Sequence, residues 1–135
     1  MGHKILVCDD EPFILKALTF VLRKDGHTVL EARNGEEALE KIRAENPVLV
    51  FLDVMMPKKN GYEVLEALRG DAAFASTYVI LLTAKGQDSD RERGLAMGAN
   101  EFMTKPFSPA AILTRLREIL GGAAAPGAAP APPSN

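Results

Sequence analysis

The sequence has one cysteine and no tryptophan, and it lacks any long apolar run. The lone Cys8 excludes a disulfide framework and favours a reducing compartment, where we expect it to be a buried apolar side chain rather than a reactive thiol. No segment approaches the roughly 18 apolar residues needed to span a bilayer. The first residues also lack the apolar core of a signal peptide. We therefore expect a cytoplasmic protein without membrane contact.

The sequence also lacks an excess of charge of either sign. The 16 Lys and Arg residues nearly balance the 18 Asp and Glu residues, and the formal net charge is −2. No basic stretch stands out, which argues against a direct nucleic-acid partner or an anionic membrane surface. The length of 135 residues and the 47% hydrophobic content are instead typical of one globular domain.

Short apolar runs alternate with segments of helical period along most of the chain. The runs lie at residues 5–8, 28–30, 49–52, 79–82 and 101–104, and the helical segments begin near residues 12, 34, 61, 89 and 109. This repeated βα pattern predicts an α/β fold with a parallel sheet and helices on both faces. The segment at 89–97 has the weakest apolar stripe, since only Leu95 and Met97 are clearly apolar.

Local signals also predict where several helices begin and end. Gly26 closes the first helix, and Asn34 opens the second, with Glu37 as part of a capping-box variant. Ser108 caps the last helix, directly before Pro109. Beyond residue 120 the chain is rich in Gly, Ala and Pro and carries no charge, so we expect a disordered tail over residues 121–135.

Reactive polar residues follow four of the five apolar runs. Asp9 and Asp10 follow the first run, Asp53 the third, Thr83 the fourth and Lys105 the fifth. Parallel strands have their carboxyl ends at one edge of a sheet, and ligands of open α/β sheets bind outside that edge. We therefore expect these five side chains to face a single pocket.

Their chemistry favours phosphoryl transfer to an aspartate. Neighbouring carboxylates repel each other unless a cation neutralises them, and oxygen ligands with room for water and phosphate oxygens fit Mg²⁺. A lysine and a hydroxyl would then stabilise phosphoryl oxygens, while a carboxylate serves as the nucleophile. The alternatives are a solvated acidic helix start over Asp9-Asp10-Glu11-Pro12, a surface role for Lys105 and an ordinary strand end at Thr83.

Four motifs in register with the strands carry a family resemblance. They are Asp9-Asp10, the segment Leu-Asp-Val-Met-Met-Pro-Lys-Lys-Asn-Gly at 52–61, Leu-Thr-Ala at 82–84 and Lys-Pro-Phe at 105–107. Together they make residues 1–120 resemble the receiver domain of bacterial two-component response regulators, of the single-domain type. The resemblance implies a doubly wound, flavodoxin-like (βα)5 fold with strand order 2-1-3-4-5.

The resemblance also implies a role for each site residue. Asp53 would accept a phosphoryl group from a histidine kinase or a phosphotransfer protein. Asp9, Asp10, Asp53 and the backbone carbonyl of Met55 would hold Mg²⁺.

Thr83 and Lys105 would bind the phosphoryl oxygens, and Thr83 would move toward them. Phe102 occupies the position of the switch aromatic, although a half-buried strand phenylalanine without that role is the alternative. The Lys105–Pro106 bond would be cis, as is usual in the family.

A receiver of this kind would be a signalling switch rather than an enzyme acting on a separate substrate. It would catalyse only its own phosphorylation and dephosphorylation. Phosphorylation would alter the face formed by the fourth helix, fifth strand and fifth helix, which would bind a downstream protein. The short tail leaves no room for an output domain, so we expect output through a partner or a phosphorelay.

Three other classes of protein fit these residues less well. A haloacid-dehalogenase-type phosphatase needs Asp-x-Asp after the first strand, whereas this chain has Asp9-Asp10-Glu11. A flavin-binding flavodoxin needs a Ser, Thr or Gly-rich phosphate loop there, and the acidic residues would repel the flavin phosphate. A docking module that is never phosphorylated would not require all five site residues.

Overall fold

The computed structural model describes residues 2–56, 58–84, 88–105 and 107–120, without the side chains of residues 84 and 88–90. Strands and helices alternate along these residues. The strands are β1 (Lys4–Cys8), β2 (Thr28–Ala32), β3 (Leu49–Asp53), β4 (Tyr78–Ala84) and β5 (Glu101–Lys105). The helices are α1 (Pro12–Lys24), α2 (Gly35–Glu45), α3 (Gly61–Arg69), α4 (Asp88–Ala96) and α5 (Pro109–Leu120), with a short 3-10 helix η1 (Ala72–Phe74).

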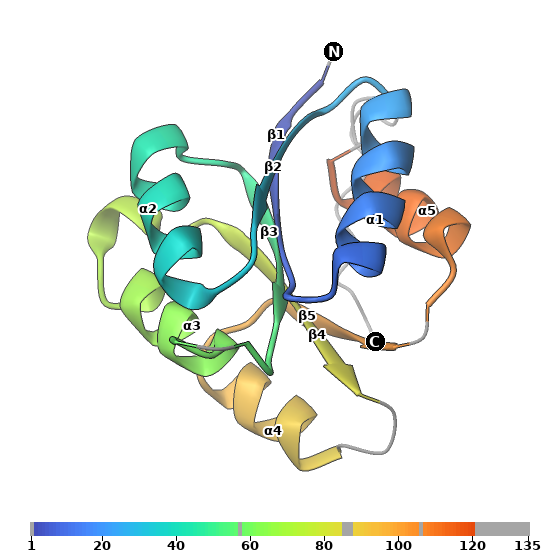
Figure 1. The fold of residues 1–135 in the computed structure, drawn as a ribbon. Coiled ribbons are helices and arrows are strands. Elements are labelled where there is room, and N and C mark those ends of the chain that lie inside the picture. Colours follow the sequence, from blue (N-terminus) through green and yellow to red (C-terminus); the bar gives the residue numbers. More distant parts are fainter. Residues whose placement is uncertain (1, 57, 85–87, 106, 121–135) are drawn as a thin grey trace.

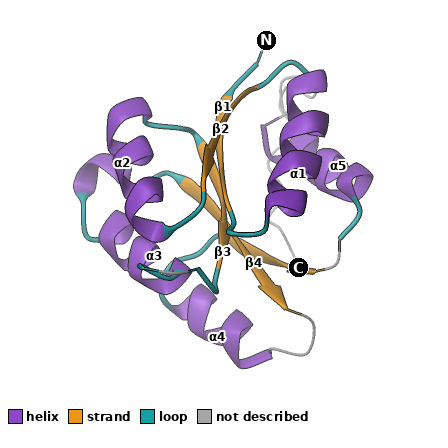
Figure 2. Ribbon diagram, viewed as in Figure 1, coloured by secondary structure: helices purple, strands orange, loops and turns teal. Residues whose placement is uncertain are grey.

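The strands form one parallel sheet in the order β2-β1-β3-β4-β5. Helices α1 and α5 lie together on one face, and α2, α3 and α4 cover the other, as Figures 1 and 2 show. This arrangement confirms the predicted doubly wound α/β fold and its strand order.

Each face of the sheet has its own apolar core, because successive strand residues point to opposite faces. Leu6 and Val50 pack toward α2 and α3, whereas Val7 and Phe51 pack toward α1 and α5. All five residues of β3 are buried, which accounts for the continuous apolar run that precedes Asp53. The strand therefore carries Asp53 to the edge of the sheet from the centre of the protein.

The predicted helix starts are confirmed at two caps. The Asn34 side chain accepts a hydrogen bond from the backbone N–H of Glu37 at 2.8 Å, and the Ser108 hydroxyl accepts one from Ala111 at 3.2 Å. The second half of the capping box at α2 is displaced by one residue, because the Glu37 carboxylate accepts from the N–H of Arg33 at 2.7 Å.

Several boundaries differ from the sequence-based expectation. Strand β4 continues to Ala84, so Thr83 lies inside the strand rather than after it. The short 3-10 helix η1 lies in the connection between α3 and β4. Pro57, Pro106 with its predicted cis bond and the tail at 121–135 lie outside the described residues. No helix in the described part of the chain has the length and apolar character that crossing a membrane requires.

Arg69, the last residue of α3, ties together the segments that lead into β4 and β5. Its guanidinium donates to Asn100 Oδ1 and to the carbonyl oxygens of Gly98 and Thr77, each at 2.9 Å, and to those of Phe74 and Ala75 at 3.2 and 3.3 Å. These bonds satisfy main-chain acceptors that no strand partner reaches.

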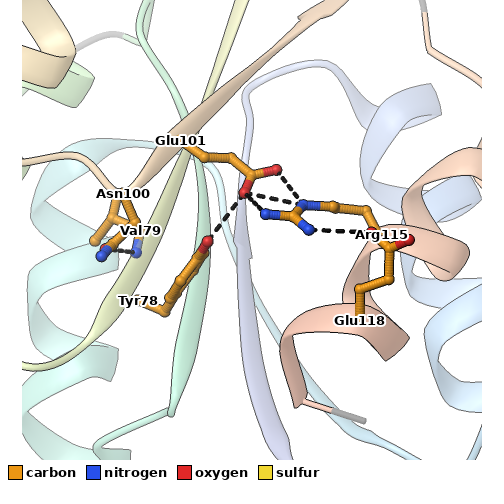
Figure 3. A network of polar contacts seen from close by, with 6 residues as sticks. All are labelled: Tyr78, Val79, Asn100, Glu101, Arg115 and Glu118. Atoms are coloured by element: carbon orange, nitrogen blue, oxygen red, sulfur yellow. Dashed lines mark hydrogen bonds and ion pairs between the residues drawn. The ribbon is translucent and has the colours of Figure 1, made fainter. Parts of the chain in front are cut away.

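A second network joins β4, β5 and α5 (Figure 3). Arg115 of α5 donates from Nε and Nη2 to the carboxylate of Glu101 in β5 at 2.6 to 3.0 Å, and Glu101 accepts the Tyr78 hydroxyl at 2.9 Å. Burial and the bond to Glu101 raise the pKa of Tyr78 to about 12. The bidentate geometry fixes α5 on β5.

The free edge of the sheet at β2 is covered by two cationic side chains. Arg23 of α1 donates to the carbonyl oxygen of Val29 at 3.3 Å, and Lys41 of α2 donates to that of Glu31 at 2.6 Å. The N–H of Thr28, the residue before Val29, donates inward to the carbonyl oxygen of His3. Because main-chain groups of a strand alternate in direction, the bonded carbonyls are those that point away from β1.

Candidate functional site

The three predicted carboxylates meet at the carboxyl edge of the sheet. Asp9 follows β1 and is fully buried, Asp53 ends β3 and is 5% exposed, and Asp10 is exposed. One carboxylate oxygen from each residue lies within 4.8 Å of the others. Strands β1 and β3 are neighbours in the sheet, which places their ends side by side.

Lys105, at the end of β5, reaches across the sheet edge to this cluster. Its ammonium lies 2.7 Å from Asp9 Oδ2, 3.4 Å from Asp53 Oδ2 and 3.1 Å from Glu11 Oε1. Its long side chain thus extends from β5, an outer strand, past the end of β4 to the ends of β3 and β1. Lys105 therefore lies in the predicted site. Its ammonium contacts the carboxylates, whereas the family resemblance implies contact with phosphoryl oxygens.

The electrostatics of the cluster favour a bound cation. Burial and the neighbouring Asp9 raise the pKa of Asp53 to about 7, although Lys105 and the N–H of Met55 oppose this rise. Burial lowers the pKa of Lys105, but its contacts with Asp9 and Asp53 outweigh that effect and hold the pKa above the ordinary value. One ammonium does not offset the mutual repulsion of the acidic groups.

The loop after Asp53 folds back against the end of β3. The N–H of Met55 donates to Asp53 Oδ1 at 3.2 Å, and the N–H of Gly61 donates to the carbonyl oxygen of Val54 at 3.0 Å. A Cβ at Gly61 would lie 2.5 Å from the carbonyl oxygen of Asp53. The glycine at 61 thus permits the start of α3 to approach the strand end that carries the central aspartate.

Thr83 and Phe102 lie on the two strands next to the acidic cluster. Asp53 pairs in register with Leu82, so Thr83 is the next residue of β4 and is 3% exposed. Phe102 is half-buried and packs against the core under α3 and α4. The guanidinium of Arg91 in α4 lies over its ring, 4.4 Å from the centroid.

The donor set fits Mg²⁺. Hard carboxylate oxygens are the ligands this ion prefers, and it usually retains several waters beside one or two carboxylates. Asp9, Asp10 and Asp53 would hold it, and the expected further ligand is the carbonyl of Met55, whose side chain is 71% exposed.

Two contacts of the site were missed from the sequence. Glu11 was interpreted only as part of an acidic helix start, yet its carboxylate bonds Lys105. Its position directly after Asp9 and Asp10, in the turn that leaves β1, is the signal that could have indicated this. The stacking of Arg91 on Phe102 has no local sequence signal, because it depends on how α4 lies against β5.

Comparison with known proteins agrees with this architecture. A family model described as the response regulator receiver domain matches residues 5–117. The alkaline phosphatase synthesis transcriptional regulatory protein PhoP of Bacillus subtilis is 44% identical over 120 residues, which are 89% of this chain and 49% of PhoP. Protein PilH of Pseudomonas aeruginosa is 36% identical over 119 residues, covering 88% of this chain and 98% of PilH.

The chain thus spans about half the length of PhoP and of other transcriptional regulatory proteins that it matches. Among solved structures, the chemotaxis response regulator CheY4 of Vibrio cholerae superposes with a TM-score of 0.83 at 30% identity, over 89% of this chain and 100% of that one. The match of motifs, sheet order and family model leads to one conclusion: this chain belongs to the response regulator receiver domain family.

Proposed function

We propose that this receiver domain accepts a phosphoryl group on Asp53 in a reaction that depends on Mg²⁺. The observation that carries the proposal is the meeting of three carboxylates within 4.8 Å at the end of a buried strand. The ammonium of Lys105, 3.4 Å from Asp53, supports it, since a fixed cation stabilises a phosphorylated carboxylate.

The donor would be a phosphohistidine on a histidine kinase or a phosphotransfer protein. A carboxylate oxygen of Asp53 attacks the phosphorus, the P–N bond breaks as the O–P bond forms, and the departing imidazole nitrogen takes a proton from solvent. Bound Mg²⁺ supplies charge compensation for the phosphoryl oxygens. Lys105 turns from Asp9 toward those oxygens, and the Thr83 hydroxyl donates to them.

The same residues would limit the domain to its own chemistry. The carboxylate nucleophile is 5% exposed, and its described neighbours include the carboxylates of Asp9 and Asp10 and the ammonium of Lys105, which would contact a metal ion and a phosphoryl group. We therefore propose a signalling phosphoacceptor that catalyses only its own phosphorylation and dephosphorylation, in the reducing cytoplasm that the buried Cys8 suits.

Intact-protein mass spectrometry tests the central proposal. The chain is incubated with acetyl phosphate and MgCl₂, and a gain of one phosphoryl group is expected. EDTA and Asp53→Asn should each abolish the gain, whereas Asp71→Asn, at an exposed carboxylate that caps η1, should retain it. Absence of any gain, with a phosphorylated histidine kinase as donor as well, would contradict the proposal.

The output face is proposed to be the surface of α4, β5 and α5. Support comes from the unequal anchoring of these elements, since Arg115 fixes α5 on β5 while Gly94 is the single buried residue between 91 and 96 in α4. Amide chemical shifts recorded with and without acetyl phosphate should change more along residues 91–105 than along α2. Larger changes in α2 would argue for another face.

The expectation that the domain works without an output domain stays a prediction. Relatives of both kinds match, because the aligned region covers 98% of PilH but 49% of PhoP. A downstream protein bound through the α4, β5 and α5 surface would serve either arrangement.

A further inference from the structure

Gly35 begins α2 in a part of the chain to which the proposed chemistry assigns no role. Glycine is less favourable than alanine in a helix. Its backbone does not need the freedom of glycine, because the described glycines with positive φ are Gly26 and Gly98. A residue with a side chain would therefore be tolerated here by the backbone alone.

Space explains the glycine. A Cβ at Gly35 would overlap the carbonyl oxygen and the Cβ of Lys59, and it would lie 2.6 Å from the carbonyl carbon of Lys59. Real Cβ atoms do not make such contacts, so either α2 or the segment around Lys59 would have to move. Lys59 belongs to the loop that connects Asp53 to α3.

The loop is the part that would yield. Helix α2 is fixed by Ala38, Leu39 and Ile42, which are buried in the core under the sheet. Lys58, by contrast, is exposed and has a φ of 66°, a left-handed conformation that is unfavourable for a residue with a side chain. A loop already under strain moves more readily than a helix held by three buried side chains.

The end of the loop that leads into α3 is held in place. Asn60 and Glu63 form a complete capping box at the start of α3, and Gly61 packs against the carbonyl of Asp53. Displacement at Lys59 is therefore transmitted toward Met55, whose N–H bonds the carboxylate of Asp53 at 3.2 Å.

We infer that Gly35 is a positioning residue of the metal site, an inference that rests on the proposed Mg²⁺-dependent function. The missing side chain lets the backbone of Lys59 lie directly on the first turn of α2. That contact holds the loop in the position where the N–H of Met55 donates to the carboxylate of Asp53. Residues far apart in sequence, on α2 and on the loop after β3, thus jointly set the geometry of the cation ligands.

Calorimetric titration with MgCl₂ tests the inference in Gly35→Ala. Outer residues that orient metal ligands typically change affinity by roughly 10–100-fold, and we expect the Mg²⁺ dissociation constant to rise by about 10-fold or more. The matched control is Gly70→Ala, because a Cβ at Gly70 would meet its nearest atom at 3.3 Å and lies at the other end of α3. This control should change the constant by less than about 2-fold.

Two further measurements separate the possible failures. The amide chemical shifts of residues 58–61 in metal-free Gly35→Ala should differ from those of the wild type. This measurement does not depend on Mg²⁺ binding, so a wild type that binds no Mg²⁺ would refute the proposed function alone. Asn60→Ala removes only the helix cap at the other end of the same loop. This variant should therefore fold even if Gly35→Ala does not, and its Mg²⁺ affinity should also fall. The inference would be overturned if Gly35→Ala bound Mg²⁺ as tightly as the wild type, or if its amide shifts at residues 58–61 were unchanged. If Gly35→Ala does not fold, wild-type Mg²⁺ affinity in Asn60→Ala would overturn it.

Discussion

Replacing Asp53 with asparagine is expected to stabilise the metal-free protein at pH 8, although it removes the proposed phosphoacceptor. Asp53 is 5% exposed and lies beside the fully buried Asp9, and these conditions raise its pKa from 3.8 to about 7. Holding this carboxylate charged without a metal therefore costs folding free energy, and the neutral amide of asparagine escapes that cost.

The magnitude follows from the linkage between protonation and folding. The native pKa is above the unfolded value, so the native state binds more protons between about pH 4 and pH 7, and stability falls as the pH rises through that window. A shift of about 3 units corresponds to about 4 kcal/mol at 1.36 kcal/mol per unit. Allowing for imperfect accommodation of the amide beside Lys105, we expect Asp53→Asn to gain about 2 to 4 kcal/mol at pH 8 and little at pH 4.

Urea unfolding in EDTA, followed by circular dichroism, provides the assay. With a slope of about 1.5 kcal/mol/M, the variant's midpoint at pH 8 should exceed that of the wild type by at least about 1 M. Addition of MgCl₂ should stabilise the wild type and reduce the difference, because ligand binding to the native state shifts unfolding. Asp71→Asn serves as the exposed-carboxylate control. Equal midpoints for the wild type and Asp53→Asn at pH 8 would refute the reasoning.

Other perturbations test the framework around the site. Arg69→Met should lose about 3 kcal/mol of unfolding free energy, since it leaves carbonyl acceptors unpaired. Arg43→Met, at an exposed position, should change this free energy little. Equal losses for the two variants in urea titrations would contradict the prediction. Burial lowers the pKa of His27, whose Nδ1 accepts the N–H of His3, so the wild type should lose more stability below pH 6.5 than His27→Gln does. Burial and Asp9 raise the pKa of Cys8, so Ellman's reagent should modify it only under unfolding conditions.

Much of the fold follows from local pattern. Strand β3 is apolar from Leu49 to Leu52 because both of its faces are covered, and the caps at Asn34 and Ser108 are local bonds that a short sequence window contains. The acidic cluster was predictable for a topological reason, since parallel strands bring their carboxyl ends to one edge. The meeting of Asp9, Asp53 and Lys105 could therefore be predicted without knowledge of side-chain packing.

The unpredicted features all depend on contacts between distant segments. The overlap that excludes a side chain at Gly35 involves Lys59, and the stacking on Phe102 involves Arg91 from a helix with almost no apolar stripe. The five acceptors of Arg69 come from two different connections, the one that leads into β4 and the one that leads into β5. Periodicity identifies which face of an element is buried, but it does not specify the neighbour that the face meets.

The cationic cover over β2 has a consequence for assembly. An uncovered outer strand offers a row of main-chain acceptors and donors to any other extended chain, which is how sheets grow into aggregates. Here the side chains of Arg23 and Lys41 already occupy the outward carbonyls. Their loss would turn a closed border into a template, so a protein neutralised at both positions should nucleate intermolecular sheets at concentrations where the native chain stays dispersed.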